Sequence, residues 1–234
     1  MTVADNHPFY AAFERHRYHI GTMLNGDARA FRQLSATEDA FHAVVFHVFY
    51  DTTDYPAYRQ QGSGETIRDR QRRLLTQVAL DHPEWILALL RSPWHWQRME
   101  AELADLFVYL EWICAPGTRA APEIGEFALA VIRREFPCPE SCRETALGIL
   151  FNLQPPGAWP TIWQALMEDP DAAIREAVVM RAADFPEHRP PAAVAPALQG
   201  LIERLAGARE QISVVRNARA LLHRMDTADS IGRP

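Results

Sequence analysis

Apolar residues recur along most of the chain at intervals of three and four, the spacing of helices that bury one face. Short turns rich in proline separate these stretches, and no stretch alternates apolar and polar residues strongly enough to predict a strand. The pattern therefore predicts an all-α protein of about ten helices. The expected helices span residues 9–24, 35–50, 66–80, 83–90, 92–113, 122–136, 139–153, 159–168, 170–184, 192–205 and 210–225, with a short helical turn at 27–34.

Polar residues mark where two of these helices should begin. Ser35 and Glu38 have the spacing of a capping box, which predicts that Ser35 caps the helix after it. Asp169 precedes Pro170, a residue suited to a first helical turn, so Asp169 is expected to cap the helix at 170–184. The residues at 227–234 have little to bury, and we expect a flexible tail there.

A short motif around an arginine occurs three times. Ile-Arg-Glu-Ala-Val at 174–178 aligns with Cys-Arg-Glu-Thr-Ala at 142–146 and with Val-Arg-Asn-Ala-Arg at 215–219. An acidic residue stands six positions before the arginine in two of the copies, as Asp169 and Glu210, whereas Pro137 holds that position in the first copy. Similar motifs at similar intervals indicate a repeated helix pair.

Residues 157–184 resemble one HEAT repeat: a first helix containing a proline, a turn with Asp169, and a second helix with Arg175. The resemblance covers roughly residues 120–226 and implies an α-α superhelix, a HEAT-like (armadillo-type) solenoid. In that family the acid and the arginine link successive repeats, so Asp169 and Arg175 are expected to bridge adjacent helix pairs. We expect a single domain at 1–226, in which residues 1–115 form a divergent helical N-terminal part.

Composition narrows the choice of function. The 234 residues carry a formal charge of -6, which argues against a dedicated nucleic-acid binder, and no apolar run is long enough for a membrane span. A targeting segment is not recognisable, so we expect a cytoplasmic protein. All basic residues are arginines, which is typical of a GC-rich bacterial genome rather than of selection for the guanidinium group.

The sequence motifs of common enzymes are missing, and no cofactor or metal is expected. A candidate buried polar site remains, because His42, His47 and Glu111 lie in very apolar helical stretches. A buried carboxylate needs a partner, which a histidine can supply. His42 and His47 are five residues apart and point away from each other on a helix, so a structural role is favoured over a metal or small-molecule site.

Two further sets of residues are weaker metal candidates. Cys138 and Cys142 are four residues apart at a helix start, but two thiols need more ligands, and buried or capping cysteines are the favoured interpretation. His16 and His19 share a helix face near Glu14, but the spacing differs from the Glu-x-x-His pairs of di-iron bundles.

The second helices of the repeats are the favoured functional surface, because solenoids present extended faces built from equivalent positions. Five arginines are expected there as a partner-binding stripe, although links between repeats would also explain them: Arg143, Arg175, Arg181, Arg216 and Arg219. Our first hypothesis is a non-enzymatic scaffold or regulatory, immunity-type module whose partner is another protein. The alternative is an enzyme resembling the HEAT-type DNA alkylation glycosylases, for which Asp105 and the six tryptophans are the candidate residues.

Overall fold

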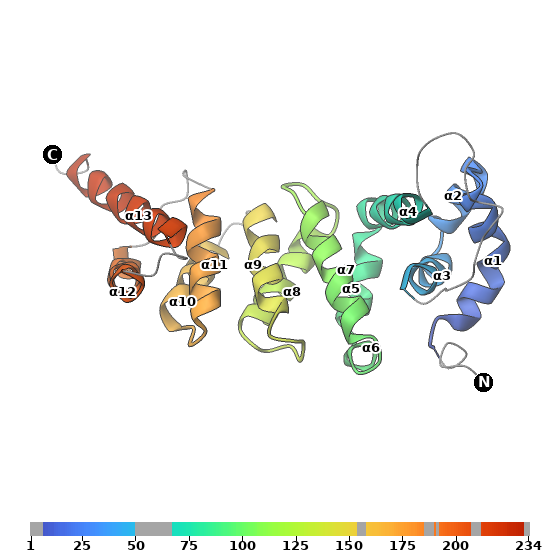
Figure 1. Ribbon diagram of the computed structural model, residues 1–234, viewed down its shortest axis with the longest axis horizontal. Helices are drawn as coiled ribbons and strands as arrows, with labels where there is room; N and C mark the ends of the chain where they lie inside the picture. Colours follow the sequence, from blue (N-terminus) through green and yellow to red (C-terminus); the bar gives the residue numbers. More distant parts are fainter. Residues whose placement is uncertain are drawn as a thin grey trace. The chain divides into compact units, whose positions relative to one another are not determined.

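The computed structural model describes residues 7–49, 67–153, 158–184, 190, 192–206 and 212–231. Within these ranges the chain forms thirteen α-helices and one 3-10 turn and no strand, which confirms the all-α prediction and exceeds the expected ten helices (Figure 1). The contacts divide the chain into two compact units, Met1–Ile113 and Cys114–Pro234. None of the described helices is long and apolar enough to cross a membrane.

The first unit contains α1 to α7. Helix α1 packs on α2 and α3, α3 packs on α4, and both α4 and α5 pack on α7. Fully buried side chains from these helices form its core, among them Ile20, Leu34, Phe41, Leu74, Ile86 and Phe107. The helices are α1 (Tyr10–Leu24), α2 (Ala28–Leu34), α3 (Glu38–Phe49), α4 (Ile67–Asp81), α5 (Pro83–Leu90), α6 (Pro93–Trp96) and α7 (Glu100–Ile113).

The helix predicted at 92–113 is interrupted. Ser92 caps the short α6, and a new helix, α7, begins at Glu100. The Trp96 indole N–H donates to the backbone oxygen of Leu90 at 2.7 Å, which holds α6 against the end of α5. The apolar spacing continues through this break, so the sequence pattern alone predicts one helix where the structure has two.

Thr37, not Ser35, supplies the cap of α3. The Thr37 hydroxyl accepts a hydrogen bond from the backbone N–H of Ala40 at 3.2 Å, and α3 begins at Glu38. The Ser35 hydroxyl instead donates to the backbone oxygen of Arg32, at the end of the preceding helix. The helix therefore starts later than the capping-box pattern predicted.

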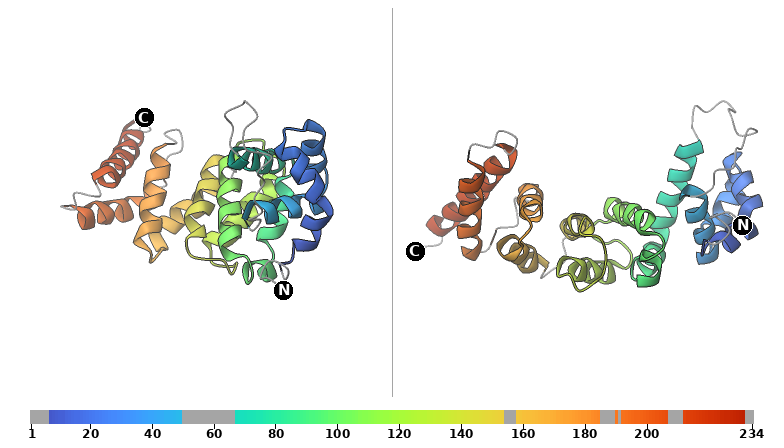
Figure 2. Two further views of the ribbon diagram at one scale, coloured as in Figure 1. Left: turned by 45° about the vertical axis from the view of Figure 1, so that its right-hand side comes forward. Right: turned by 60° about the horizontal axis from the view of Figure 1, so that its bottom comes forward.

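The second unit consists of three consecutive helix pairs (Figures 1 and 2). Its elements are α8 (Ala121–Ile132), α9 (Cys142–Leu153), α10 (Ala158–Glu168), α11 (Ala172–Ala183), the 3-10 turn η3 (Ala192–Val194), α12 (Ala195–Leu205) and α13 (Ile212–Ile231). Helices α8 and α9, α10 and α11, and α12 and α13 pack on each other. The second helices also contact one another in order, α9 with α11 and α11 with α13, while α8 contacts α10.

Two details of the second unit differ from the sequence prediction. Asp171 caps α11 by accepting from the backbone N–H of Ala173 at 2.9 Å, so Asp169 is left for another role. Helix α13 continues to Ile231, so residues 227–231 belong to a helix where the pattern predicted a tail. Residues 232–234 of that expected tail lie outside the described residues.

Candidate functional site

A buried ion pair connects two neighbouring helix pairs of the second unit. Arg143 of α9 donates to the carboxylate of Asp169, which lies in the turn between α10 and α11. The two residues are only 3% and 5% exposed. Other Arg143 donors reach the backbone oxygen of Ile132 at 3.0 Å and the Glu140 carboxylate at 2.7 Å. The guanidinium therefore joins α8/α9 to the turn of the following pair through several oxygen acceptors.

Asp169 is held in its ionised form. Burial disfavours the carboxylate, but hydrogen bonds from Arg143 and from the backbone N–H of Asp171 outweigh burial and lower the pKa of Asp169. Arg134 adds a more distant positive charge, with its Nη2 at 3.9 Å from the carboxylate. The site is thus a fully ionised, hydrogen-bonded pair.

The role predicted for Arg175 requires a correction. Arg175 donates to the backbone oxygen of Asp169 and not to its carboxylate. That contact stays within the α10/α11 pair, whereas the link between pairs uses Arg143 of the preceding motif copy. Pro137 occupies the position of the acid expected for Arg143, and Asp169 of the next pair supplies that acid instead.

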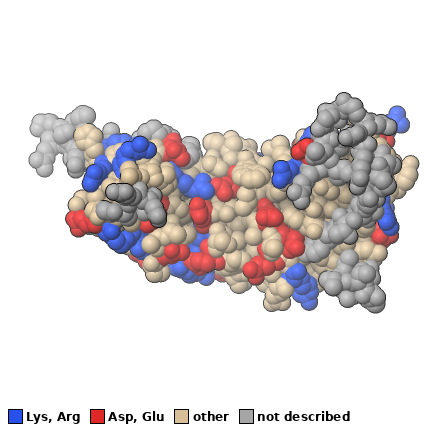
Figure 3. Space-filling model, viewed as in Figure 1, with Lys and Arg blue, Asp and Glu red and all other residues tan. Residues whose placement is uncertain are grey.

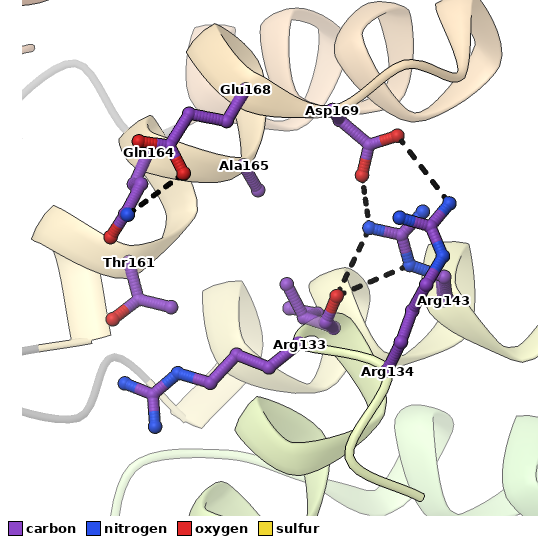
Figure 4. A pocket seen from close by; sticks show the side chains of 9 residues that line it. Arg133, Arg134, Arg143, Thr161, Gln164, Ala165, Glu168 and Asp169 are labelled. Carbon is purple, nitrogen blue, oxygen red and sulfur yellow. Dashed lines mark hydrogen bonds and ion pairs between the residues drawn. The ribbon is translucent and has the colours of Figure 1, made fainter. Parts of the chain in front are cut away.

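A polar pocket of about 360 Å³ surrounds this ion pair (Figure 4). The end of α8 and helix α10 form its walls, and its lining includes Arg133, Arg134, Thr161, Gln164 and Glu168. Gln164 donates to Glu168 at 2.9 Å, and Arg134 to Glu140 at 2.7 Å. Figure 4 shows Arg133 extending away from Asp169, along the side on which Thr161 lies. The pocket therefore offers mixed polar groups rather than one dominant charge.

A second concavity lies on the second helices of the three pairs, and we call it the α11 groove. It measures about 470 Å³ and is lined from α9, α11 and α13 by Glu144, Ala173, Glu176, Ala177, Met180, Arg181, Ser213 and Val214. Met180 is 37% exposed, and the side-chain nitrogen of Asn217 lies 3.3 Å from its sulfur. Methionine and arginine are enriched at protein interfaces, whereas glutamate is depleted there, so Met180 and Arg181 are the groove residues that most favour a protein partner.

The five arginines of the predicted stripe have different surroundings. Arg181 lines the α11 groove. Arg143 is buried in the ion pair, and half-buried Arg175 contacts the Asp169 backbone. Arg216 and Arg219 are exposed on α13 and do not line the groove. Of the five, Arg181 therefore lies at the α11 groove, Arg143 lies at the polar pocket, and Arg143 and Arg175 have structural contacts.

The candidate buried polar site divides into separate environments. His47 is 1% exposed and shares a 2.9 Å hydrogen bond with the Gln71 side chain of α4. His42 stacks on Phe9, with ring centroids 4.2 Å apart. Glu111 is half-buried on α7. The two histidines thus have different partners, as their five-residue spacing suggested.

His42 belongs to a cluster around Phe9, with His7 and His95, that no sequence motif indicates. The Phe9 ring lies within 5.5 Å of the rings of His7 and His95, in addition to His42. Burial lowers the pKa of all three histidines, that of His7 to about 4, and Glu102 opposes this effect at His7. Buried nitrogens of His42 and His95 have no hydrogen-bond partner among the described residues. The cluster therefore favours neutral imidazoles.

The weaker metal candidates have other contacts. His16 of α1 lies 2.9 Å from the Asp39 carboxylate of α3, to which Arg15 also binds, so His16 connects two helices. Cys138 and Cys142 are thiols, the first half-buried and the second buried. Among the described residues, no group of three or more His, Cys, Asp and Glu side chains is arranged to hold a metal ion.

Some residues at the two concavities could not have been identified from the sequence. Arg133, Thr161 and Gln164 are polar residues on otherwise ordinary helix surfaces, and only the packing of α10 beside α8 brings them together. Met180 had a weak signal, because it follows two buried valines on α11 and falls outside the apolar face. Comparisons of the chain with protein-family models, curated proteins and solved structures each found no match.

Proposed function

We propose that this chain is a non-enzymatic binding module for another protein, and that the second unit is a short helical solenoid of the HEAT-like kind. Helix α9 contacts α11, and α11 contacts α13, which is the succession of neighbours that a solenoid has. The Arg143–Asp169 link between consecutive pairs is of the kind that the resemblance implies. The module acts as a scaffold or regulatory partner.

The α11 groove carries this proposal. Its walls come from three successive second helices, so a bound segment contacts all three pairs at once. Met180, Ala177 and Val214 offer apolar surface for an aliphatic or aromatic side chain. Glu144 and Glu176 offer acceptors for a basic group beside it. A partner helix or loop with one apolar anchor and a neighbouring arginine or lysine matches these contacts.

The charge distribution supports a protein partner over nucleic acid. Basic and acidic atoms alternate over the second unit on the face shown in Figure 3, where the continuous basic stripe expected for phosphate binding is not seen. Of the residues named for the glycosylase alternative, Asp105 and Trp112 are exposed on α7, whereas Trp163 is buried in the second unit. We therefore place the partner-binding surface on α9, α11 and α13.

Site-specific photocrosslinking tests the proposal. A photoreactive phenylalanine at position 180 should capture a protein from the native lysate, and the same group at Tyr18, which is 76% exposed on α1, should not. With the captured partner purified, Glu176→Arg should weaken binding about tenfold, the loss typical of one interface contact. Glu126→Arg makes the same charge change at an exposed position of α8 and should leave the dissociation constant unchanged.

Two results would reject the proposal. Equal binding by Glu176→Arg and Glu126→Arg places the interface elsewhere. Duplex DNA binding that weakens steeply with salt, without a crosslinked protein, favours the nucleic-acid alternative. Turnover of a small molecule by the purified chain would show an enzyme instead.

A further inference from the structure

The polar pocket beside the buried ion pair, which we call the α8–α10 pocket, contains two residues whose charged groups are already bound. The Arg143 guanidinium donates to Asp169, to Glu140 and to the Ile132 backbone oxygen. The second carboxylate oxygen of Asp169 accepts from the backbone N–H of Asp171. Both members of the ion pair thus have partners within the protein. The groups that can receive a ligand therefore lie on the walls of the pocket.

Helix α10 lines one wall with a row of polar side chains. Thr161, Gln164 and Glu168 follow one another at intervals of three and four residues, so they lie on one face of the helix. The Gln164 amide nitrogen donates to Oε2 of Glu168 at 2.9 Å, which leaves the Gln164 carbonyl oxygen and the other Glu168 oxygen as acceptors. The Thr161 hydroxyl has no partner among the described residues. The row therefore runs from a hydroxyl to a carboxylate.

The end of α8 supplies a positive charge on the opposite wall. Arg133 directly follows α8 and is exposed, and its guanidinium has no hydrogen bond or ion pair within the described part of the chain. Figure 4 shows its side chain extending away from Asp169, on the side where Thr161 lies. The neighbouring Arg134 is instead bound to Glu140 at 2.7 Å. Arg133 is therefore the guanidinium that this wall can offer to an anionic group.

We propose that the α8–α10 pocket binds a small zwitterion, a molecule with a carboxylate at one end and an ammonium at the other. The carboxylate accepts from Arg133 and from the Thr161 hydroxyl. The ammonium donates to Glu168 and to the carbonyl oxygen of Gln164. A simple anion would be repelled by Glu168, and a simple cation by Arg133, so a ligand with one charge of each sign is favoured.

The spacing of the α10 row sets the length of the ligand. Thr161 and Glu168 are about 10 Å apart along the helix axis, at about 1.5 Å per residue, so the two charges of the zwitterion lie several bonds apart. The pocket volume of about 360 Å³ lies at the lower end for small-molecule sites. The pocket shares no lining residue with the α11 groove, so this inference does not depend on the proposed protein-binding function.

Titration with triglycine, followed by nuclear magnetic resonance, tests the proposal. An extended tripeptide spans about 10 Å, which matches the α10 row. Adding triglycine to the isotope-labelled full chain should shift the backbone signals of Arg133, Thr161 and Gln164, with a dissociation constant of about 1 mM for a ligand of this size. The signal of Met180 in the α11 groove should not move.

Two analogues of the peptide and two variants of the protein separate the charges. N-acetyltriglycine lacks the ammonium and triglycinamide lacks the carboxylate, and each should bind wild type about tenfold more weakly than triglycine. Arg133→Gln should weaken triglycine binding about tenfold without weakening triglycinamide binding. Glu168→Gln should weaken triglycine binding to the same extent without weakening N-acetyltriglycine binding. Arg204→Gln, at an exposed position of α12, is the matched control and should bind triglycine as wild type does.

Three results would overturn the proposal. The first is the absence of any shift at about ten times the expected dissociation constant. The second is equal affinity for triglycine and its two analogues, because the charges would then play no part. The third is a set of shifts spread over the surface rather than gathered at α8 and α10. Circular dichroism of each variant checks that the helices are intact before affinities are compared.

Discussion

The guanidinium of Arg143 and the carboxylate of Asp169 form a buried ion pair that joins one helix pair to the next. Both charges are removed from water, and each has further partners: Arg143 binds Ile132 and Glu140, and Asp169 accepts from the backbone of Asp171. Such a pair adds little net stability over apolar packing, but the loss of one partner leaves a buried charge that is compensated only by its remaining contacts. We expect its main effect to be on the specificity of the geometry between the two pairs.

Asp169→Asn should destabilise the second unit by about 3 kcal/mol, at the lower end of the cost of breaking a buried pair, because Arg143 keeps the Glu140 carboxylate. Urea unfolding followed by circular dichroism measures this. The double variant Arg143→Met with Asp169→Leu should lose less free energy of unfolding than the sum of the losses in Arg143→Met alone and Asp169→Leu alone. The reason is that neither charge of the pair remains in it. A loss below about 1 kcal/mol for Asp169→Asn would mean that the pair is solvated.

Arg175→Ala should cost about 1 kcal/mol without abolishing the fold, since it removes a hydrogen bond to a backbone oxygen and leaves the Asp169 carboxylate paired. Hydrogen exchange should show loosening of α10 and α11 before global unfolding. The effect should be smaller than that of Asp169→Asn. The reverse order would restore Arg175 as the main link between the pairs, as the sequence motif first indicated.

Lowering the pH should reduce the free energy of unfolding of the first unit before its carboxylates titrate. The folded-state pKa of His7 is about 4, against 6.5 for an ordinary histidine, so the unfolded chain binds more protons below pH 6.5. Stability is therefore complete above pH 6.5 and falls as the pH is lowered toward 4. Allowing for the partial exposure of His7, the loss should reach about 1–2 kcal/mol.

Urea unfolding between pH 7 and 5 checks this slope. His7→Gln should flatten it, while His223→Gln, at an exposed position of α13, should not. Part of the dependence of stability on pH should remain in His7→Gln, because burial lowers the pKa of both His42 and His95. A slope that survives unchanged in His7→Gln would assign the effect to other groups.

The cap of α3 gives a fourth prediction. Thr37→Ala removes the acceptor for the Ala40 N–H and should cost about 1 kcal/mol. Ser35→Ala removes a hydroxyl whose bond goes to the end of the preceding helix, so its effect should be smaller. Thermal unfolding of the two variants compares them. A larger loss for Ser35→Ala would support the capping box that the sequence predicts.

Helix identity was predictable because residues such as Ile20, Leu74 and Phe107 recur with a helical period and are buried. Helix ends were less predictable, since several polar residues compete for each cap and only packing decides between Asp169 and Asp171.

The candidate sites were more difficult to predict from the sequence than the helix ends. The sequence motif drew attention to Arg143, but its acid is 26 residues away and belongs to the next pair, so a local pattern of acid and arginine could not identify it. The Phe9 cluster depends on His7 and His95, which come from distant parts of the chain and share no motif.

The 26-residue separation of Arg143 from Asp169 also determines the order in which the two residues become available during synthesis. During synthesis Arg143 leaves the ribosome first, with Glu140 and the Ile132 carbonyl available to it but without its buried carboxylate. Helix α10 must emerge and fold back on α8 before Asp169 reaches the guanidinium. The α8/α9 pair is therefore completed by the chain that follows it, because a nascent protein stopped at Leu153 would still lack one of the two carboxylates that bind Arg143.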